Sequence, residues 1–485
     1  MKITIKIFSV MFLLINSLLI AQQSRLDQLG GLSYSIIDID SQIDPFILGE
    51  NPAWLVNSQL KQRLDIIPYF KNSKGNYHRN YESGNIFNYA INFMALKPLG
   101  KSGTFRGIAK YNYDFHKDRN KILTLNPYSG DAFFFTDTTS GDYKYNGPTF
   151  ELMHSLEFAD KLYFGASVNY QILDGLKKVY TYAETLYRKV SGNVGLAYEI
   201  TKNLVIGANY KVNDEQERIV ATDVNNRTVQ TFLYRGEIYN IELRGTSQSY
   251  KLKKHGNSFA IQTKYTPFPN LVVGLNAKYS ISNSKSLFPQ NSIIEVEDGY
   301  TNFSNTNIII QAKWVQSDNL TIGITSGYTD YSSWSKNSKL NLTIWDIYLK
   351  NIFAGIGATY LNQKNKYIVG AEYELQSVDA DSNKYIDNKF PKLSSLNHNI
   401  KIGFEKYIND LFIFRFGYNF IYKKHDFIFG GDNVKIQFIT LGGKFKLSEI
   451  LEIEPSIEYA FTTLSENSLY KNNLGIYITL RFYKF

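Results

Sequence analysis

The chain of 485 residues contains no cysteine. Disulfide bonds, cysteine-ligated zinc, a thiol nucleophile and a lipid-anchored lipoprotein N-terminus are therefore excluded. Histidine is also scarce: there are six, and no two have the spacing of zinc ligands on a helix. The sequence has no nucleophile elbow, phosphate-binding loop or zinc-protease motif. We expect no metal, no cofactor and no enzymatic activity.

Charge is sparse as well, at 20% of residues, and 53 basic against 44 acidic side chains leave a net charge of +9. This is no concentrated basic patch, so nucleic acid is not an expected partner. The mean hydropathy is −0.26, which argues against a bundle of membrane helices. Aromatic residues are abundant, however, with 37 Tyr and 33 Phe. This combination is typical of strands that are apolar on one face only.

The first 21 residues have the pattern of a secretory signal peptide. Lys2 and Lys6 precede an apolar run over 7–20, and Ala21 comes before a polar stretch. The alternative is a signal anchor. No later stretch reaches the roughly 18 apolar residues that a membrane helix requires. We expect residues 1–21 to be removed on export.

From residue 60 to 485, segments of alternating polarity predict strands. In one of them Leu162, Phe164, Ala166, Val168 and Tyr170 face one way, and the residues between them face the other. Eighteen such segments lie near 60–71, 86–97, 103–116, 146–159, 161–174, 187–200, 203–217, 256–266, 270–282, 303–316, 319–333, 350–361, 366–377, 396–407, 411–423, 434–447, 449–462 and 473–485. Residues 340–347 belong either to a loop or to the strand beside them.

The connections alternate between very short turns and long polar loops, such as 117–145 and 218–255. This alternation is characteristic of bacterial outer-membrane barrels, which have short periplasmic turns and longer outer loops. The predicted fold is an all-β transmembrane antiparallel barrel of about 18 strands, with a range of 14–18, in the Gram-negative cell outer membrane. The alternative is a secreted propeller or sandwich, but no blade-length repeat is visible.

Charged residues follow the inward phase of the strands, because a charge facing lipid costs about 2–4 kcal/mol at the midplane. The residues expected to face the lumen include both basic and acidic side chains. We therefore favour a wall whose lumenal charges pair with one another. The main candidates are Arg106, Lys110, Lys278, Arg415, Glu452, Glu454, Glu458 and Arg481. The same phase assigns to the lumen Lys189, Lys211, Lys264, Lys313, Lys401, Asp114, Glu151, Glu157, Glu199, Glu372, Glu374 and Glu405.

Residues 22–59 lack the strand pattern and are expected to form a plug or hatch. They contain Gly30-Gly31-Leu32-Ser33-Tyr34, an acidic stretch and the motif Asn51, Pro52, Ala53, Trp54. This start resembles the N-terminal segment of FadL-like barrels, although Trp54 replaces their usual glycine and the strands outnumber their fourteen. The whole chain is more similar to an uncharacterised outer-membrane β-barrel family of Bacteroidota. The FadL resemblance implies a hatch inside the barrel and transport of hydrophobic molecules. The alternative is an unstructured periplasmic leader.

Two further expectations concern the burial of the plug segment and its acidic residues. Phe46, Trp54 and Leu55 are apolar and need burial inside the barrel. Lumenal cations can then pair with Asp38, Asp40, Asp44 and Glu50. Residues 379–383 and Asp387 form an acidic group expected in an outer loop. That group lacks the glycine and glutamate of a calcium loop, so solvated carboxylates are the favoured interpretation.

The sequence thus predicts a membrane barrel with outer-membrane lipid around it. The favoured function is a passive channel or FadL-like transporter of small solutes, hydrophobic ones included. The alternative is a non-enzymatic subunit of a larger outer-membrane complex for TonB-dependent uptake or secretion. Its long surface loops would then bind a TonB-dependent receptor, a surface lipoprotein or a secretion partner, since binding surfaces favour aromatic residues.

Overall fold

The computed structural model describes residues 44–57, 62–178, 181–223, 225, 227–236, 240–289, 294–427, 429–464 and 469–483. The expected signal peptide, the glycine-rich start with Asp38 and Asp40, and Phe485 lie outside these ranges. Within them, no helix has the length and apolar character needed to cross a membrane.

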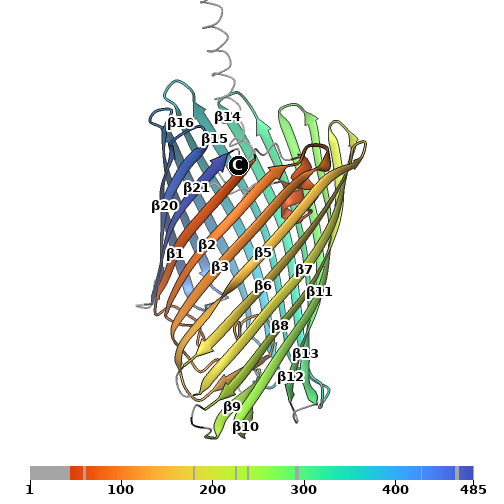
Figure 1. Cartoon of the computed structure of the whole chain (residues 1–485), viewed down its shortest axis with the longest axis vertical. Coiled ribbons are helices and arrows are strands. Elements are labelled where there is room, and N and C mark those ends of the chain that lie inside the picture. Colours follow the sequence, from red (N-terminus) through yellow and green to blue (C-terminus); the bar gives the residue numbers. More distant parts are fainter. Residues whose placement is uncertain are drawn as a thin grey trace, which may run out of the picture.

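Eighteen antiparallel strands form one closed barrel, which confirms the predicted fold and strand number (Figure 1). Each strand pairs with its neighbours along the chain, and β1 pairs with β21 to close the ring. The strands are β1 (Arg63–Gly75), β2 (Asn85–Pro98), β3 (Thr104–Arg119), β5 (Gly141–Ala159), β6 (Leu162–Lys177), β7 (Tyr182–Thr201), β8 (Leu204–Thr222), β11 (Ser247–Phe268), β12 (Leu271–Pro289), β13 (Glu295–Val315), β14 (Leu320–Asn337), β15 (Leu342–Asn362), β16 (Tyr367–Lys384), β17 (Lys392–Tyr407), β18 (Phe412–His425), β19 (Asp432–Lys446), β20 (Leu451–Leu464) and β21 (Tyr470–Tyr483).

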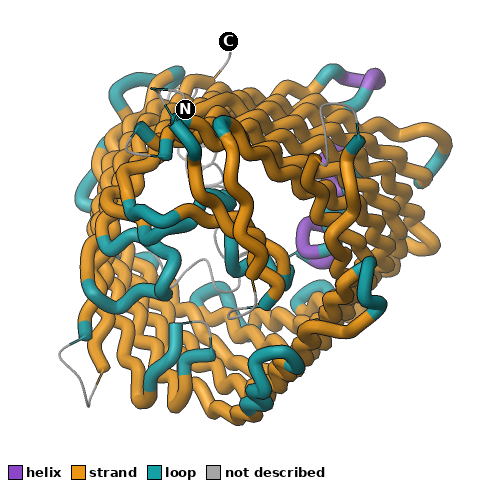
Figure 2. The backbone as a smooth tube through the Cα atoms, turned by 90° about the horizontal axis from the view of Figure 1, so that it is seen from below, coloured by secondary structure: helices purple, strands orange, loops and turns teal. Residues whose placement is uncertain are grey.

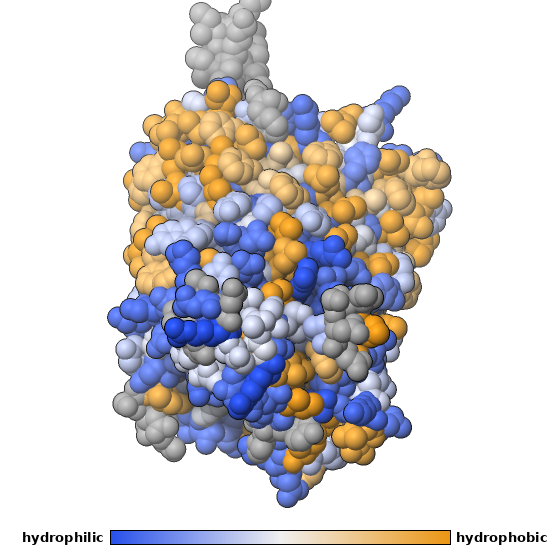
Figure 3. Space-filling model, turned by 60° about the horizontal axis from the view of Figure 1, so that its bottom comes forward, coloured by the Kyte–Doolittle hydropathy of each residue, from blue (hydrophilic) through white to orange (hydrophobic). Residues whose placement is uncertain are grey.

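The two-residue period of the strands separates an apolar outer face from a polar inner face. On β15, Ile352 and Ile356 are 57% and 56% exposed on the outer side, and Asn351 lies on the inner phase beside them. On β18, Arg415 and Asn419 are buried inside the barrel. Figure 3 shows apolar side chains over the part of the wall nearer the short turns, whereas the long-loop end is mostly hydrophilic. This is the surface that a lipid bilayer requires.

Most strands extend further toward the long-loop end than the sequence pattern indicated. The strand expected at 256–266 covers Ser247–Phe268, and the one expected at 303–316 covers Glu295–Val315. These extensions lie beyond the apolar belt, where polar residues occupy both faces and the alternation of hydropathy is lost. Residues 342–347 belong to β15. The acidic group at 379–383 lies within β16 rather than in a loop, which corrects that expectation.

The two longest loops contain short strands of their own. Residues 120–140 contain β4 (Phe133–Asp137), and residues 223–246 contain β9 (Val229–Arg235) and β10 (Asn240–Gly245); the three strands form a small sheet in the order β10-β9-β4. We call these two segments the loop inserts. Each leaves from paired strand ends, Arg119 opposite Gly141 and Thr222 opposite Ser247. Seen from the long-loop end, strand and loop segments cross the space inside the barrel (Figure 2).

The loop inserts have an apolar core against the inner wall. Leu123, Phe135 and Leu233 pack with inward side chains of four barrel strands: Tyr143 and Tyr145 of β5, Ala183 of β7, Ile219 and Ala221 of β8, and Tyr250 of β11. The inserts also reach β13 and β14: Arg235 forms a buried ion pair with Asp298, and the backbone N–H of Ala132 donates to Ser335 Oγ at 3.3 Å. The two loop inserts therefore cover part of the inner wall at this end.

Candidate functional site

Residues 44–57, which we call the hatch segment, lie inside the barrel near its short-turn end. They form two short helices, α2 (Pro45–Leu48) and α3 (Trp54–Asn57), which are the helical turns inside the ring in Figure 2. Asp44 caps α2 by accepting a hydrogen bond from the Phe46 N–H at 2.9 Å. The segment buries its apolar side chains in a cluster with the wall, made of Phe46, Ala53, Trp54 and Leu55 with Met94, Leu96, Met153 and Ala197.

Glycines of the wall make room for the Asn51-Pro52-Ala53 motif. A Cβ atom at Gly165 of β6 would lie 2.4 Å from the Ala53 nitrogen, and one at Gly195 of β7 would lie 2.1 Å from Asn51 Oδ1. Gly165 and Gly195 are directly paired across the two strands. At Gly207 of β8, a Cβ would lie 2.5 Å from the Phe46 ring. The wall thus forms a cradle in which the hatch backbone approaches the strands too closely for any side chain.

Asn51 is the central polar contact of the hatch segment and is completely buried. Its Nδ2 donates to the carbonyl of Leu196 at 3.0 Å, to that of Ala208 at 3.3 Å and to Gln262 Oε1 at 2.9 Å. Its Oδ1 accepts from the Ala53 N–H at 3.0 Å. A buried amide without these partners would cost about 1–3 kcal/mol, so Asn51 fixes the position of the segment.

Ion pairs join the hatch segment to the lumenal wall. Asp44 Oδ2 lies 2.9 Å from Lys264 Nζ, and Glu50 Oε2 lies 3.1 Å from Lys211 Nζ and 2.7 Å from Lys278 Nζ. Burial raises the pKa of Glu50, but the Lys278 and Lys211 ammonium groups outweigh burial, so this pKa lies below its ordinary value. Glu50 has a positive φ of 58° and its carbonyl accepts from Asn193 Nδ2 at 2.5 Å. Both carboxylates pair with lysines that the strand phase assigned to the lumen.

A cavity of about 330 Å³ lies in the lumen between the hatch segment and the loop inserts. Glu50 lines it from the hatch, Ser129 lines it from the loop inserts, and Tyr331 lines it from β14. Four lysines from four neighbouring strands complete its charged lining: Lys189 of β7, Lys211 of β8, Lys254 of β11 and Lys278 of β12. We call this space the lysine cavity.

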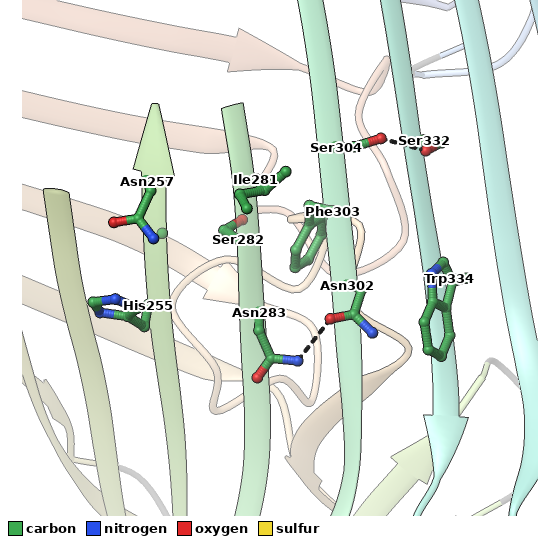
Figure 4. A pocket seen from close by; sticks show the side chains of 11 residues that line it. His255, Asn257, Ile281, Ser282, Asn283, Asn302, Phe303, Ser304, Ser332 and Trp334 are labelled. Atoms are coloured by element: carbon green, nitrogen blue, oxygen red, sulfur yellow. Dashed lines mark hydrogen bonds between the residues drawn. The ribbon is translucent and has the colours of Figure 1, made fainter. Parts of the chain in front are cut away.

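A second cavity, of about 390 Å³, shares part of its lining with the lysine cavity, including Ser282, Phe303 and Ser304 (Figure 4). Asn283 donates to Asn302 at 2.8 Å, and the hydroxyls of Ser304 and Ser332 are 2.7 Å apart. The pairing of β11 through β14 is continuous at this level. Most of its lining residues, such as Asn257, Ile281 and Ser304, are cross-strand partners on the outward phase of the strands. This second space is therefore a groove on the outer face of the wall, and the continuous strand pairing closes the wall between it and the lysine cavity.

Four of the other lumenal residues singled out in the sequence, Arg415, Arg481, Glu452 and Glu454, take part in ion pairs near the short-turn end. Arg415 lies 3.1 Å from Glu405 and 3.5 Å from Glu454, and Arg481 lies 3.3 Å from Glu454 and 2.9 Å from Asp65. Nearby, Glu452 pairs with Lys444 at 2.7 Å. This network ties β17, β18, β20, β21 and β1 together across the closure of the barrel.

Three candidates lie outside that network. Arg106 lies 3.7 Å from Glu151, Lys110 lies 5.3 Å from the centre of the Tyr69 ring, and Glu458 lies on the same face of β20 as Glu454. Of the eight main candidates, only Lys278 lines the lysine cavity. The sequence did not predict Lys254 as a lumenal residue, because residue 254 was assigned to a loop. Its alternation with Gly256 and Ser258 would have placed it on the inner face of β11.

The described residues contain no group of three or more His, Asp or Glu side chains placed to hold a metal ion. What the structure defines is an outer-membrane-type β-barrel with an occupied lumen, a hatch segment held by side-chain contacts and a cationic cavity behind it. The chain belongs to the family described as "Family of unknown function (DUF6850)", whose model matches residues 52–330. This region includes most of the motif at 51–54 and all four lysines of the cavity. No curated protein matches the chain.

Solved structures similar in fold are outer-membrane barrel transporters and channels. The siderophore receptor PiuA from Acinetobacter baumannii is 10% identical, with 86% of this chain and 82% of that chain covered and a TM-score of 0.42. A Pseudomonas aeruginosa FadL homologue is 11% identical over 93% and 94% of the two chains, with a TM-score of 0.38. The Ralstonia pickettii toluene transporter TbuX is 11% identical over 95% and 99%, with a TM-score of 0.35. These likenesses concern the fold.

Proposed function

We propose that this chain is a passive, gated transporter of small solutes in the Gram-negative outer membrane, with the short turns in the periplasm. The hatch segment is the gate. The observation that carries the proposal is how this segment is held: by side-chain hydrogen bonds, ion pairs and apolar contacts with the inner wall, and by no strand pairing among the described residues. The segment can therefore leave its cradle while all eighteen strands stay paired.

The cavity behind the hatch segment supports the same proposal. A wall made only for stability needs its lumenal charges paired with one another, as they are around Arg415 and Arg481. The lysine cavity instead keeps about 330 Å³ of open space between two occupied regions of the lumen. A solute held there is separated from the periplasm by the hatch segment and from the outside by the loop inserts.

A crosslink between the hatch segment and the wall tests the gate. Because the chain has no cysteine, Asp44→Cys with Lys264→Cys can be joined by a bis(thiosulfonate) reagent whose length matches the lost ion pair. Each thiol displaces one sulfinate and forms a disulfide that can later be reduced. The protein is reconstituted into liposomes and the efflux of small radiolabelled solutes is measured. We expect efflux at least tenfold slower in the crosslinked protein, with recovery on reduction. Asp44→Cys alone, treated in the same way, is the control. Equal efflux before and after reduction would refute the gate.

A further inference from the structure

The lysine cavity has more positive than negative charge among its lining residues. Glu50 is the one carboxylate in the described lining, against four lysines. Lys211 and Lys278 both pair with Glu50, and Lys189 lies 3.4 Å from Glu215 on the next strand. Lys254 forms no ion pair among the described residues; its Nζ lies 3.8 Å from the centre of the Phe303 ring.

Asp131 of the loop inserts is the nearest further carboxylate. It is fully buried beside Lys254, where burial raises its pKa, and it accepts hydrogen bonds from Ser284 and Ser129. Even with Asp131 and Glu215 ionised, four ammonium groups face three carboxylates. Partly desolvated cations require a counter-charge, because burial of an unpaired charge is costly. The cavity is therefore short of negative charge.

Glu50 belongs to the hatch segment and not to the wall. Its carboxylate bridges Lys211 of β8 and Lys278 of β12. The side chain is half-exposed toward the cavity, with 45% of its surface accessible. A free anion of similar chemistry can make the same two contacts. When it does, the hatch segment loses both Glu50 ion pairs, and the unfavourable left-handed backbone of Glu50 is free to relax.

We infer that the lysine cavity binds small anions with two or more carboxylate or oxyanion groups, which replace the Glu50 carboxylate on Lys211 and Lys278 and thereby release the hatch segment. This inference rests on the proposed function and names its substrate class. Serine and asparagine side chains of the lining, such as Ser258, Ser280 and Asn305, supply hydrogen-bond donors for the remaining oxygens. An uncharged apolar solute would desolvate the lysines without forming hydrogen bonds or ion pairs with this polar lining.

Competition between Glu50 and the anion provides the test. Succinate binding to the purified full-length protein is measured by calorimetry, with glucose as the uncharged comparison. Glu50→Gln removes the competing charge but keeps the side-chain shape, so we expect succinate to bind about tenfold tighter to this variant, as two partly exposed ion pairs are lost. Lys211→Met with Lys278→Met should abolish binding. Lys401→Met, a lumenal lysine paired with Glu372 on β16 and β17, is the matched control and should bind as the wild type does.

The results separate the inference from the proposed function. Equal succinate affinity of the wild type and Glu50→Gln, absence of binding in both, or retained binding in the double lysine variant would overturn the anion site. If succinate binds as expected while the crosslinked and reduced proteins show equal efflux, the site stands and the gate fails. If the crosslink blocks efflux but succinate does not bind, the gate stands and the anion site fails. A shift in gel mobility on heating checks that each variant forms the barrel.

Discussion

Replacing Asn51 with alanine should release the hatch segment without damaging the barrel. The substitution removes the donor to Gln262 Oε1, which is completely buried, and the acceptor of the Ala53 N–H. It also removes the two contacts to the carbonyls of Leu196 and Ala208. The two amide hydrogens of Asn51 are shared among these three acceptors, and at about 1.5 kcal/mol for each hydrogen the docked state loses about 3 kcal/mol. This corresponds to about a hundredfold increase in the undocked population.

A cysteine introduced at position 155 reports that population. Ser155 lies on the inner wall of β5, is completely buried, and donates to the Ala53 carbonyl at 3.2 Å. In Ser155→Cys protein a thiol reagent can reach the sulfur only after the hatch segment has left. The labelling rate should therefore rise about a hundredfold when Asn51→Ala is added, since the rate follows the open population.

Two controls make the result specific. Asn419→Ala removes another buried lumenal asparagine, on β18, and should leave the labelling of the thiol at position 155 unchanged. A thiol introduced by Thr440→Cys, at a buried position on β19, should react equally with and without Asn51→Ala. A change of less than twofold at position 155 would refute the reasoning that Asn51 holds the hatch segment.

The same reporter and two other assays test further parts of the account. Gly195→Ala, whose Cβ would lie 2.1 Å from Asn51 Oδ1, should speed labelling of the Ser155→Cys thiol at least tenfold, whereas Gly192→Ala on the same strand meets no atom within 4 Å and should not. Ile352→Arg places a charge in lipid at a cost of about 2–4 kcal/mol and should reduce folding yield in lipid far more than the neighbouring lumenal Asn351→Arg; equal yields would contradict the strand phase. Glu50 has a lowered pKa when docked, so the docked state binds fewer protons than the undocked state and is favoured above the ordinary value of 4.5. Labelling with a dipyridyl disulfide should therefore accelerate as the pH falls below that value, and Glu50→Gln should remove this part of the pH dependence.

The sequence predicted the barrel because the bilayer imposes a strict rule on each strand. Lipid-facing positions must be apolar, so the two-residue period is visible wherever a strand crosses the membrane. The same rule placed Lys211, Lys264 and Lys278 in the lumen, where they pair with the hatch segment as the acidic residues before β1 had indicated. Beyond the membrane this constraint ends, and the extensions of β11 and β13 were taken for loops.

The structure of the loop inserts and the lysine cavity could not be predicted from the sequence. The small sheet joins residues 133–137 to 229–235, which are far apart in the chain, and only a tertiary fold determines which strands of two loops pair. The cavity depends on the space left between the hatch segment and these inserts. The charge of its lining follows from the strand phase, but the open space does not. Lys254 shows both effects, since it lies on a strand extension and faces a space that the insert defines.

Ion conductance in planar bilayers tests most directly the central claim that the lumen is closed at both ends. Four proteins are compared: the intact chain, a deletion of residues 24–57, a version with short turns in place of both loop inserts (120–140 and 223–246), and the combination of both changes. A barrel of eighteen strands is wide enough for an aqueous channel when nothing fills it. The account predicts little conductance in the intact protein and in each single variant, because one end of the lumen stays closed, and a stable porin-like conductance only when both changes are combined. A large, stable conductance in the intact protein would contradict it.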